Sequence, residues 1–293
     1  MIPSIELIRF IAVIFITFTH TRHEFKSGYF FFIIETLPTY GTAILSIISG
    51  YLYYVVSQKK PNLFFKKIKS LAIPYLIANV VVLILVLGFY YVIGYNPLNR
   101  LNYDYSLITE GLFALNSPPI NPPTYFIRDI FILFCVLALF TQKAYKTLFI
   151  LIPLLIFGTV FLRWDVVFLF IVGILFASIK NKFKKKHFLL SAGVLTLIAA
   201  IWFQNYLKFP ISFFVFVFLL DLKIKFFNSG RFTYLLHLYH SPIIVITYPI
   251  LNQYIQNEYL KVIFQILISI VFVYFLFLTT KRFKVLKTLS GGR

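Results

Sequence analysis

Arg9 and His20 are the residues of this chain best suited to chemistry, because both are ionisable and both stand in an apolar segment. They are eleven positions apart. On an α-helix, eleven steps of about 100° return to within about 20° of the start, and the rise is roughly 16 Å. Both side chains therefore point the same way. Because an ionisable side chain inside a bilayer needs a partner or a wet cavity, the pair predicts a polar cavity along this face.

Each of the two residues has a chemical role and a structural alternative. Arg9 can hold a phosphate or a carboxylate, or it can form an ion pair with Glu6, three residues earlier on the same face. A histidine with an ordinary pKa of about 6.5 can accept a proton from a hydroxyl and pass it on. His20 is thus a candidate general base, and the alternative is an interfacial residue in a polar turn.

Two further sets of polar residues fall in or beside apolar segments. Arg128 and Asp129 begin one segment, and the Asp129 carboxylate, or that of Glu24, can orient the imidazole of His20. The alternative is that Arg128 and Asp129 neutralise other buried charges. His237 and His240 lie in a later segment, where hydrogen bonding within a helix bundle is the commoner role. No carboxylate motif near these histidines completes a metal site, so we expect no bound metal.

The elements that position these residues are predicted to be membrane-spanning helices. The chain has 293 residues, of which 60% are hydrophobic and 13% charged, whereas soluble domains are about one quarter charged. Its single cysteine, Cys135, lies in an apolar segment and excludes a disulfide framework. We expect one all-α integral-membrane domain over residues 1–293, a polytopic bundle of about ten transmembrane helices. The predicted spans are 5–20, 39–57, 71–94, 124–141, 147–163, 164–179, 188–207, 209–222, 232–251 and 259–280.

The distribution of positive charge predicts the orientation. Lysine and arginine concentrate in every second loop, and such loops are cytoplasmic in membrane proteins. Both termini are therefore expected in the cytoplasm, and the net charge of +19 reflects topology rather than nucleic-acid binding. The long loop over residues 95–123 then lies outside, and its Asn, Pro and Tyr residues suit either sugar contact or a plain interfacial loop. The basic cytoplasmic segments are 59–69, 143–146, 180–186, 223–231 and 281–293.

Five short motifs carry a resemblance to a known family. The sequence is similar, in order along the whole chain, to the acyltransferase 3 family of integral-membrane O-acyltransferases, which modify bacterial surface polysaccharides. Tyr125 stands where the family usually has Trp, Thr233 where it has Ser, and His237 where it often has Tyr. The motifs are Arg9 to His20, Ile48-Ser49-Gly50-Tyr51-Leu52, Lys66-Lys67-Ile68-Lys69 to Pro74-Tyr75, Pro123 to Asp129, and Gly230 to Pro242.

The resemblance implies a bacterial inner-membrane enzyme that uses acyl-CoA, most often acetyl-CoA, as a co-substrate and holds no permanent cofactor. The acceptor would be a hydroxyl of a surface polysaccharide or lipid-linked glycan. His20 would act as general base, with Arg128 or His240 stabilising the developing charge. Polyanionic CoA would dock on lysine-rich cytoplasmic loops and thread past Arg9. The basic docking residues would be Lys66, Lys67 and Lys69, and residues with a substrate-binding or structural role would be Glu24, Ser49, Tyr125, His237 and His240.

Two other functions fit the same pattern of buried charges. A transporter or flippase for an anionic or lipid-linked glycan also needs about ten helices with buried arginines and histidines. A non-catalytic partner of a glycan polymerase is the third alternative. It would tolerate substitution at all the polar sites above.

Overall fold

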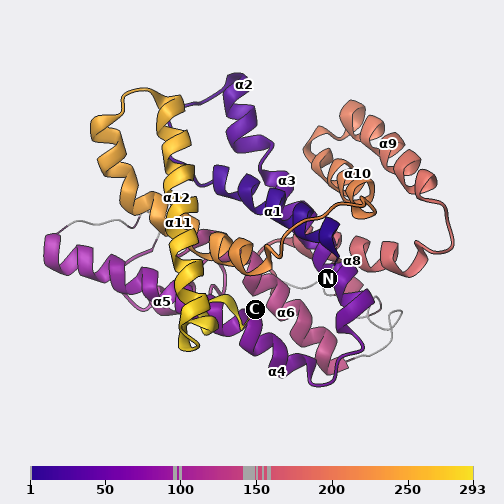
Figure 1. The fold of residues 1–293 in the computed structure, drawn as a ribbon, viewed down its shortest axis with the longest axis horizontal. Coiled ribbons are helices and arrows are strands. Elements are labelled where there is room, and N and C mark those ends of the chain that lie inside the picture. The colour runs from indigo at the N-terminus through magenta and orange to yellow at the C-terminus, as the bar shows by residue number, and fades with distance from the viewer. Residues whose placement is uncertain are drawn as a thin grey trace.

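The computed structural model describes residues 2–94, 98, 101–140, 149, 151–153, 155–156 and 160–292, and in these residues the fold is all-α, as predicted. The α-helices, shown in Figure 1, are α1 (Pro3–Phe18), α2 (Gly28–Phe31), α3 (Thr39–Leu52), α4 (Leu63–Lys67), α5 (Ile73–Gly88), α6 (Tyr125–Phe140), α8 (Trp164–Ile179), α9 (Lys185–Trp202), α10 (Lys208–Leu220), α11 (Gly230–Tyr254) and α12 (Glu258–Arg282). Tighter or wider helical turns are η1 (Phe32–Thr36), η2 (Tyr53–Ser57), η3 (Ile68–Ala72), η4 (Phe89–Ile93), η5 (Leu107–Leu112), η6 (Pro122–Thr124), η7 (Gln204–Tyr206) and η8 (Val285–Ser290).

Helices occupy nine of the ten segments predicted to span the membrane. In the described part of the chain, five helical runs are long and apolar enough to cross a bilayer: Gly28–Ser57, Leu63–Val92, Lys185–Trp202, Gly230–Tyr254 and Glu258–Arg282. Two shorter apolar helices, Trp164–Ile179 and Gln204–Leu220, match predicted spans that were also short. The predicted span 147–163 lies largely outside the described residues. The total of ten crossings and the cytoplasmic side of both termini stay predictions.

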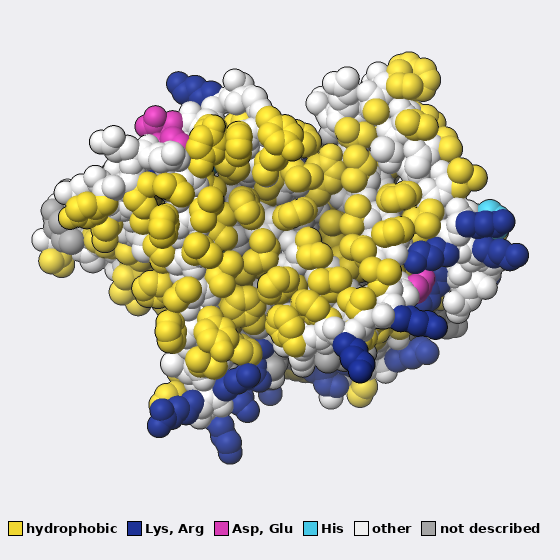
Figure 2. Space-filling model, turned by 45° about the horizontal axis from the view of Figure 1, so that its top comes forward, with side chains coloured by type: hydrophobic (Ala, Val, Ile, Leu, Met, Phe, Trp, Pro, Cys, Tyr) yellow, Lys and Arg dark blue, Asp and Glu magenta, His cyan; other side chains and the backbone are white. Residues whose placement is uncertain are grey.

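The surface fits a molecule embedded in lipid. Hydrophobic side chains cover a broad area of the face in Figure 2, and Lys and Arg gather along its lower and right-hand edges. Large apolar side chains are exposed on several long helices, including Leu197 at 66% on α9 and Phe275 at 60% on α12. Such an apolar area would cost free energy in water but none against acyl chains. The chain is therefore a multi-pass membrane protein.

Helix α3 is the centre of the packing, in contact with α1, α8 and α10, while α11 packs on α12 and α1. Three glycines bring these backbones together. A methyl group added at Gly41 would overlap the carbonyl oxygen of Ala12, and one added at Gly50 would overlap that of Phe170. Gly173 makes the reciprocal contact from α8 to Ile47. The absence of a side chain at these positions lets α1, α3 and α8 approach closely, as small residues do between membrane helices.

Substitution of Gly50 by alanine is expected to lower the free energy of unfolding by about 1–3 kcal/mol, because the added methyl group forces α3 and α8 apart. Thermal unfolding of the purified protein in detergent measures the effect. Gly193→Ala is the matched control, since Gly193 on α9 has open space at its Cβ position and alanine is the better helix former. Equal melting temperatures for the two variants would contradict the proposed contact.

Candidate functional site

Arg9 lies near the beginning of α1, beside the beginning of α11. Its Nη1 donates a hydrogen bond to Glu6 Oε1 at 2.7 Å, and the other carboxylate oxygen of Glu6 accepts one from Ser229 at 3.1 Å. Gly230 leaves room for this group, because a Cβ there would lie 3.4 Å from Arg9 Nη1. The expected ion pair with Glu6 is thus present. Arg9 nevertheless keeps 21% of its side chain exposed, toward a cavity.

His20 lies two residues beyond the end of α1, in a turn closed by a hydrogen bond from its backbone N–H to Thr17 O at 3.3 Å. Its ring packs against that of His240 on α11, with 5.1 Å between ring centroids. Since Arg9 meets the first turn of α11 and His20 meets a position ten residues later, α1 and α11 run parallel. The predicted pair of residues therefore shares one neighbouring helix.

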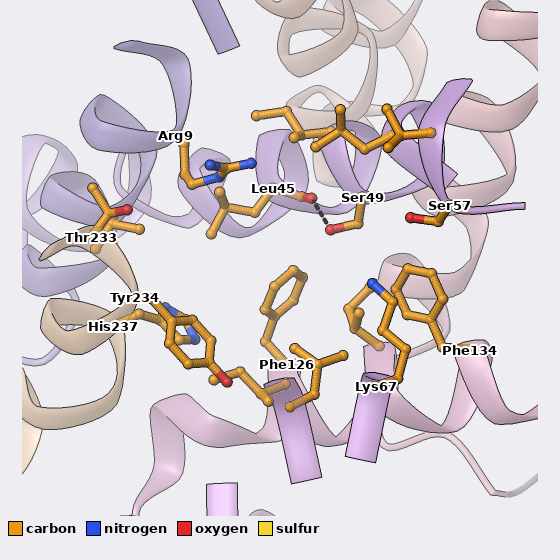
Figure 3. Close-up of a pocket in the computed structure, with 17 residues that line it drawn as sticks. Arg9, Leu45, Ser49, Ser57, Lys67, Phe126, Phe134, Thr233, Tyr234 and His237 are labelled. Carbon is orange, nitrogen blue, oxygen red and sulfur yellow. Dashed lines mark hydrogen bonds between the residues drawn. The ribbon is translucent and has the colours of Figure 1, made fainter. Parts of the chain in front are cut away.

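A cavity of about 230 Å³ opens beside Arg9 (Figure 3). Arg9, Thr233 and His237 lie at one end of the view, and Lys67, Phe134 and Ser57 lie at the other. His237 connects this cavity to the histidine pair, because its ring centroid is 6.4 Å from that of His240. A polar cavity beside Arg9 was predicted, and Arg9 does face a cavity, but most of its lining side chains are apolar. Of the three histidines, His237 lines the cavity, and the rings of His240 and His20 follow behind it.

One of the three candidate docking lysines lines the cavity. Lys67 lies at its far end with Nζ 3.5 Å from the centroid of the Phe134 ring, a cation–π contact. Lys66 and Lys69, on the same short segment, are exposed. The lysine end and the arginine end of the cavity thus provide two positive charges, separated by apolar walls from α3 and α6.

Arg128 and Asp129 are buried and paired with each other at 2.8 Å. Arg128 also donates to Val160 O at 2.7 Å, and Asp129 accepts from the backbone N–H groups of Leu162 and Arg163 at 3.3 and 3.0 Å. This pair therefore fastens the segment that leads into α8. Among the described residues, no hydrogen bond or ion pair connects Asp129 to His20.

Of the remaining candidates, Ser49 lies at the cavity, whereas Tyr125 and Glu24 are outside its lining. Ser49 lines the cavity, and its hydroxyl donates to Leu45 O at 2.8 Å. Tyr125 begins α6 and lies under the guanidinium of Arg163, 5.6 Å from its ring centroid. Glu24 is exposed, and its backbone N–H donates to Glu258 at 3.3 Å. No group of three or more His, Cys, Asp or Glu side chains in the described part of the chain could hold a metal ion.

A buried amide network holds α11 in place, and sequence reasoning missed it. Pro242 has no N–H, so the carbonyl of Leu238 loses its helical partner. The side-chain amide of Asn121 donates to that carbonyl at 2.8 Å. Asn79 Oδ1 accepts from the Asn121 backbone N–H at 3.1 Å, and its amide donates to Thr124 at 3.0 Å. Pro242 and Asn79, each inside a predicted span, were the available signal.

Replacing Asn121 with leucine is expected to lower the free energy of unfolding by about 1–3 kcal/mol, because it leaves the Leu238 carbonyl buried without a donor. Unfolding in detergent measures the loss. The double variant Asn121→Leu with Pro242→Ala restores a backbone donor to that carbonyl, so part of the stability should return. If the second substitution only adds to the damage, the carbonyl is not the group that Asn121 serves.

Glu110 organises the end of the loop that precedes α6. Its carboxylate accepts hydrogen bonds from the backbone N–H groups of Asn116 and Ser117 at 2.9 and 2.8 Å and from both side chains. These bonds, the one from the Asn116 backbone foremost, lower the pKa of Glu110 to about 2. The carboxylate is therefore ionised at neutral pH and accepts hydrogen bonds from residues 116–117, which lie shortly before α6.

Comparison with known proteins points to one family. The family model described as an acyltransferase domain matches residues 2–281. No curated protein and no solved structure shows a significant match. The matched region contains every candidate site residue named above.

Proposed function

This chain belongs to the acyltransferase-domain family, and on that premise we propose that it is a membrane O-acyltransferase that moves an acyl group from cytosolic acyl-CoA to a glycan hydroxyl. Acetyl-CoA is the proposed donor. The proposed acceptor is a surface polysaccharide or a lipid-linked glycan on the outer side of the bacterial inner membrane. The cavity between Lys67 and Arg9, with a histidine in its wall, is the observation that carries the proposal.

The cavity suits the donor's chemistry. CoA carries phosphates at one end and a thin, mostly neutral arm at the other. Lys67 offers a positive charge for the phosphates, and the walls of Leu45, Ile130 and Phe134 suit the arm. Arg9 lies along the path of the arm, so its remaining exposed donors can bind a polar group of the arm as the thioester passes on toward His20.

The reaction needs one base. His20 removes the proton from the acceptor hydroxyl as its oxygen bonds to the acyl carbon. The carbon–sulfur bond then breaks, and the imidazolium returns the proton to the departing CoA thiolate. No net proton is gained or lost. The products are an O-acylated glycan and free CoA.

Transfer and transport are separated by one experiment. Proteoliposomes receive radiolabelled acetyl-CoA and a glycolipid extract of the cells that carry the gene, and label in the glycan fraction is counted. Labelled glycan supports the proposal. Movement of glycolipid across the bilayer with no label transferred would overturn it in favour of a flippase.

Lys67→Ala is expected to raise the KM for acetyl-CoA about tenfold, the value of one charge-assisted hydrogen bond to a phosphate. Lys66→Ala is the matched control and should stay within about twofold of wild type, because Lys66 is exposed away from the cavity lining. Initial rates in the same proteoliposomes give both constants. Identical KM values for the two variants would place the donor elsewhere.

A further inference from the structure

His240 is a completely buried histidine, and one of its two ring nitrogens is hydrogen-bonded. Its Nδ1 lies 2.7 Å from the carbonyl oxygen of Leu236, one turn earlier on α11. A carbonyl oxygen only accepts, so the ring proton is on Nδ1. Nε2 therefore carries a lone pair and is an acceptor. Among the described residues this buried Nε2 has no hydrogen-bond partner.

The ring that faces His240 is that of His20. The two centroids are 5.1 Å apart, and the rings are tilted by 51°. Two imidazoles joined by an N–H···N bond of about 2.9 Å have their centres about 5 Å apart. The separation of the rings is therefore compatible with such a bond, which a reorientation of the His20 ring would form, and a protonated His20 has an N–H to donate.

Neither carboxylate expected to orient His20 makes a hydrogen bond to it among the described residues. Asp129 accepts from Arg128 and from the backbone of residues 162–163. Glu24 is exposed, and its backbone N–H donates to the carboxylate of Glu258. Among the described residues, His20 thus has no contact with a carboxylate, and the acceptor beside it is His240 Nε2.

We propose that His240 is the positioning residue for His20. As His20 takes the proton of the acceptor hydroxyl, its ring N–H donates to His240 Nε2, which holds the imidazolium in place until the proton passes to the CoA thiolate. The proton on His240 Nδ1 stays where it is, because the Leu236 carbonyl cannot take it up and pass it on. His240 thus fixes the base and does not relay the proton. This inference rests on the proposed function.

Two amide substitutions test the roles of the two ring nitrogens of His240 separately. His240→Asn keeps a donor near the Nδ1 position and has no atom at the Nε2 position. His240→Gln reaches the Nε2 position with an oxygen that accepts. In proteoliposomes with acetyl-CoA and the glycolipid extract, we expect kcat to fall about 100-fold for His240→Asn and to stay within about tenfold of wild type for His240→Gln. The KM for acetyl-CoA should change by less than about threefold in both.

Two further variants complete the test. Tyr239→Phe removes a neighbouring buried hydroxyl that has no partner in the described residues, and should match wild type. The double variant His20→Ala with His240→Asn should be no slower than His20→Ala alone, because His240 acts through His20. Melting in detergent confirms that each variant is folded.

The outcomes are distinct. Equal losses of kcat for His240→Asn and His240→Gln, additive losses in the double variant, or wild-type kcat for His240→Asn would each overturn the positioning role while His20→Ala stays inactive. Wild-type transfer by His20→Ala would instead show that His20 is not the base, which would contradict the mechanism proposed above.

Discussion

Replacement of His20 by alanine is expected to slow acyl transfer by about 10²–10⁴-fold, the usual contribution of a general base. The ring lies in a turn beyond α1, so its loss should leave the packing of α1 on α3 and α11 intact. Label transferred from acetyl-CoA to glycan in proteoliposomes measures the rate. In cells, mass spectrometry of the surface glycan gives the same information.

His23→Ala is the matched control for this experiment. His23 lies in the same turn, but its Nε2 pairs with Glu35 at 3.1 Å, away from the histidine pair. The control should retain at least about half of wild-type transfer. If both variants lose activity equally, the turn matters for structure and His20 has no special chemical role.

Asp129→Ala is expected to be the most destabilising single change considered, at about 3–5 kcal/mol, because it leaves the charge of Arg128 buried without its counter-ion. The backbone N–H groups of Leu162 and Arg163 lose their acceptor as well. The amount of folded protein in the membrane fraction and the melting temperature in detergent measure the loss.

The same variant also decides whether Asp129 orients His20 or neutralises the buried charge of Arg128. Asp221→Ala, which removes an exposed carboxylate 3.5 Å from Lys185, should cost less than about 1 kcal/mol and serves as the control. If Asp129→Ala instead melts like wild type and yet transfers no acyl group, Asp129 takes part in the reaction and the orienting role predicted for it stands.

Much of the helical framework follows from local sequence. The span predicted at 164–179 coincides with α8, because Arg163 and Asp165 mark one end and Lys180 the other. Arg163 and Lys208 both pair with Asp165, at 2.8 and 2.9 Å, and join the beginnings of α8 and α10. Charged residues at the ends of apolar runs are thus reliable markers of helix limits. The helical run before residue 39 was missed, since Glu35 and Pro38 interrupt its apolar pattern.

The candidate site was harder to predict, because its contacts join helices far apart in the chain. Helical periodicity within α1 was enough to place Arg9 and His20 along one side. The register of α11 against α1 has no local signature, so His240 was considered for charge stabilisation and not as the neighbour of His20. Depth in the membrane suggested Asp129 for that place. Depth alone could not reveal that irregular backbone at residues 160–163 would need its oxygens.

The glycine contacts of α3 have a consequence for the length of acyl chain that the enzyme would accept. At Gly41 and Gly50 the backbone of α3 lies directly against the backbones of α1 and α8, so the cavity wall supplied by Leu45 and Ile48 has little freedom to shift outward. The opposite wall includes the ring of Phe126 on α6, which a smaller residue can replace. Substitutions that let the protein use butyryl-CoA or longer donors should therefore map to α6. Few such substitutions should map to α3.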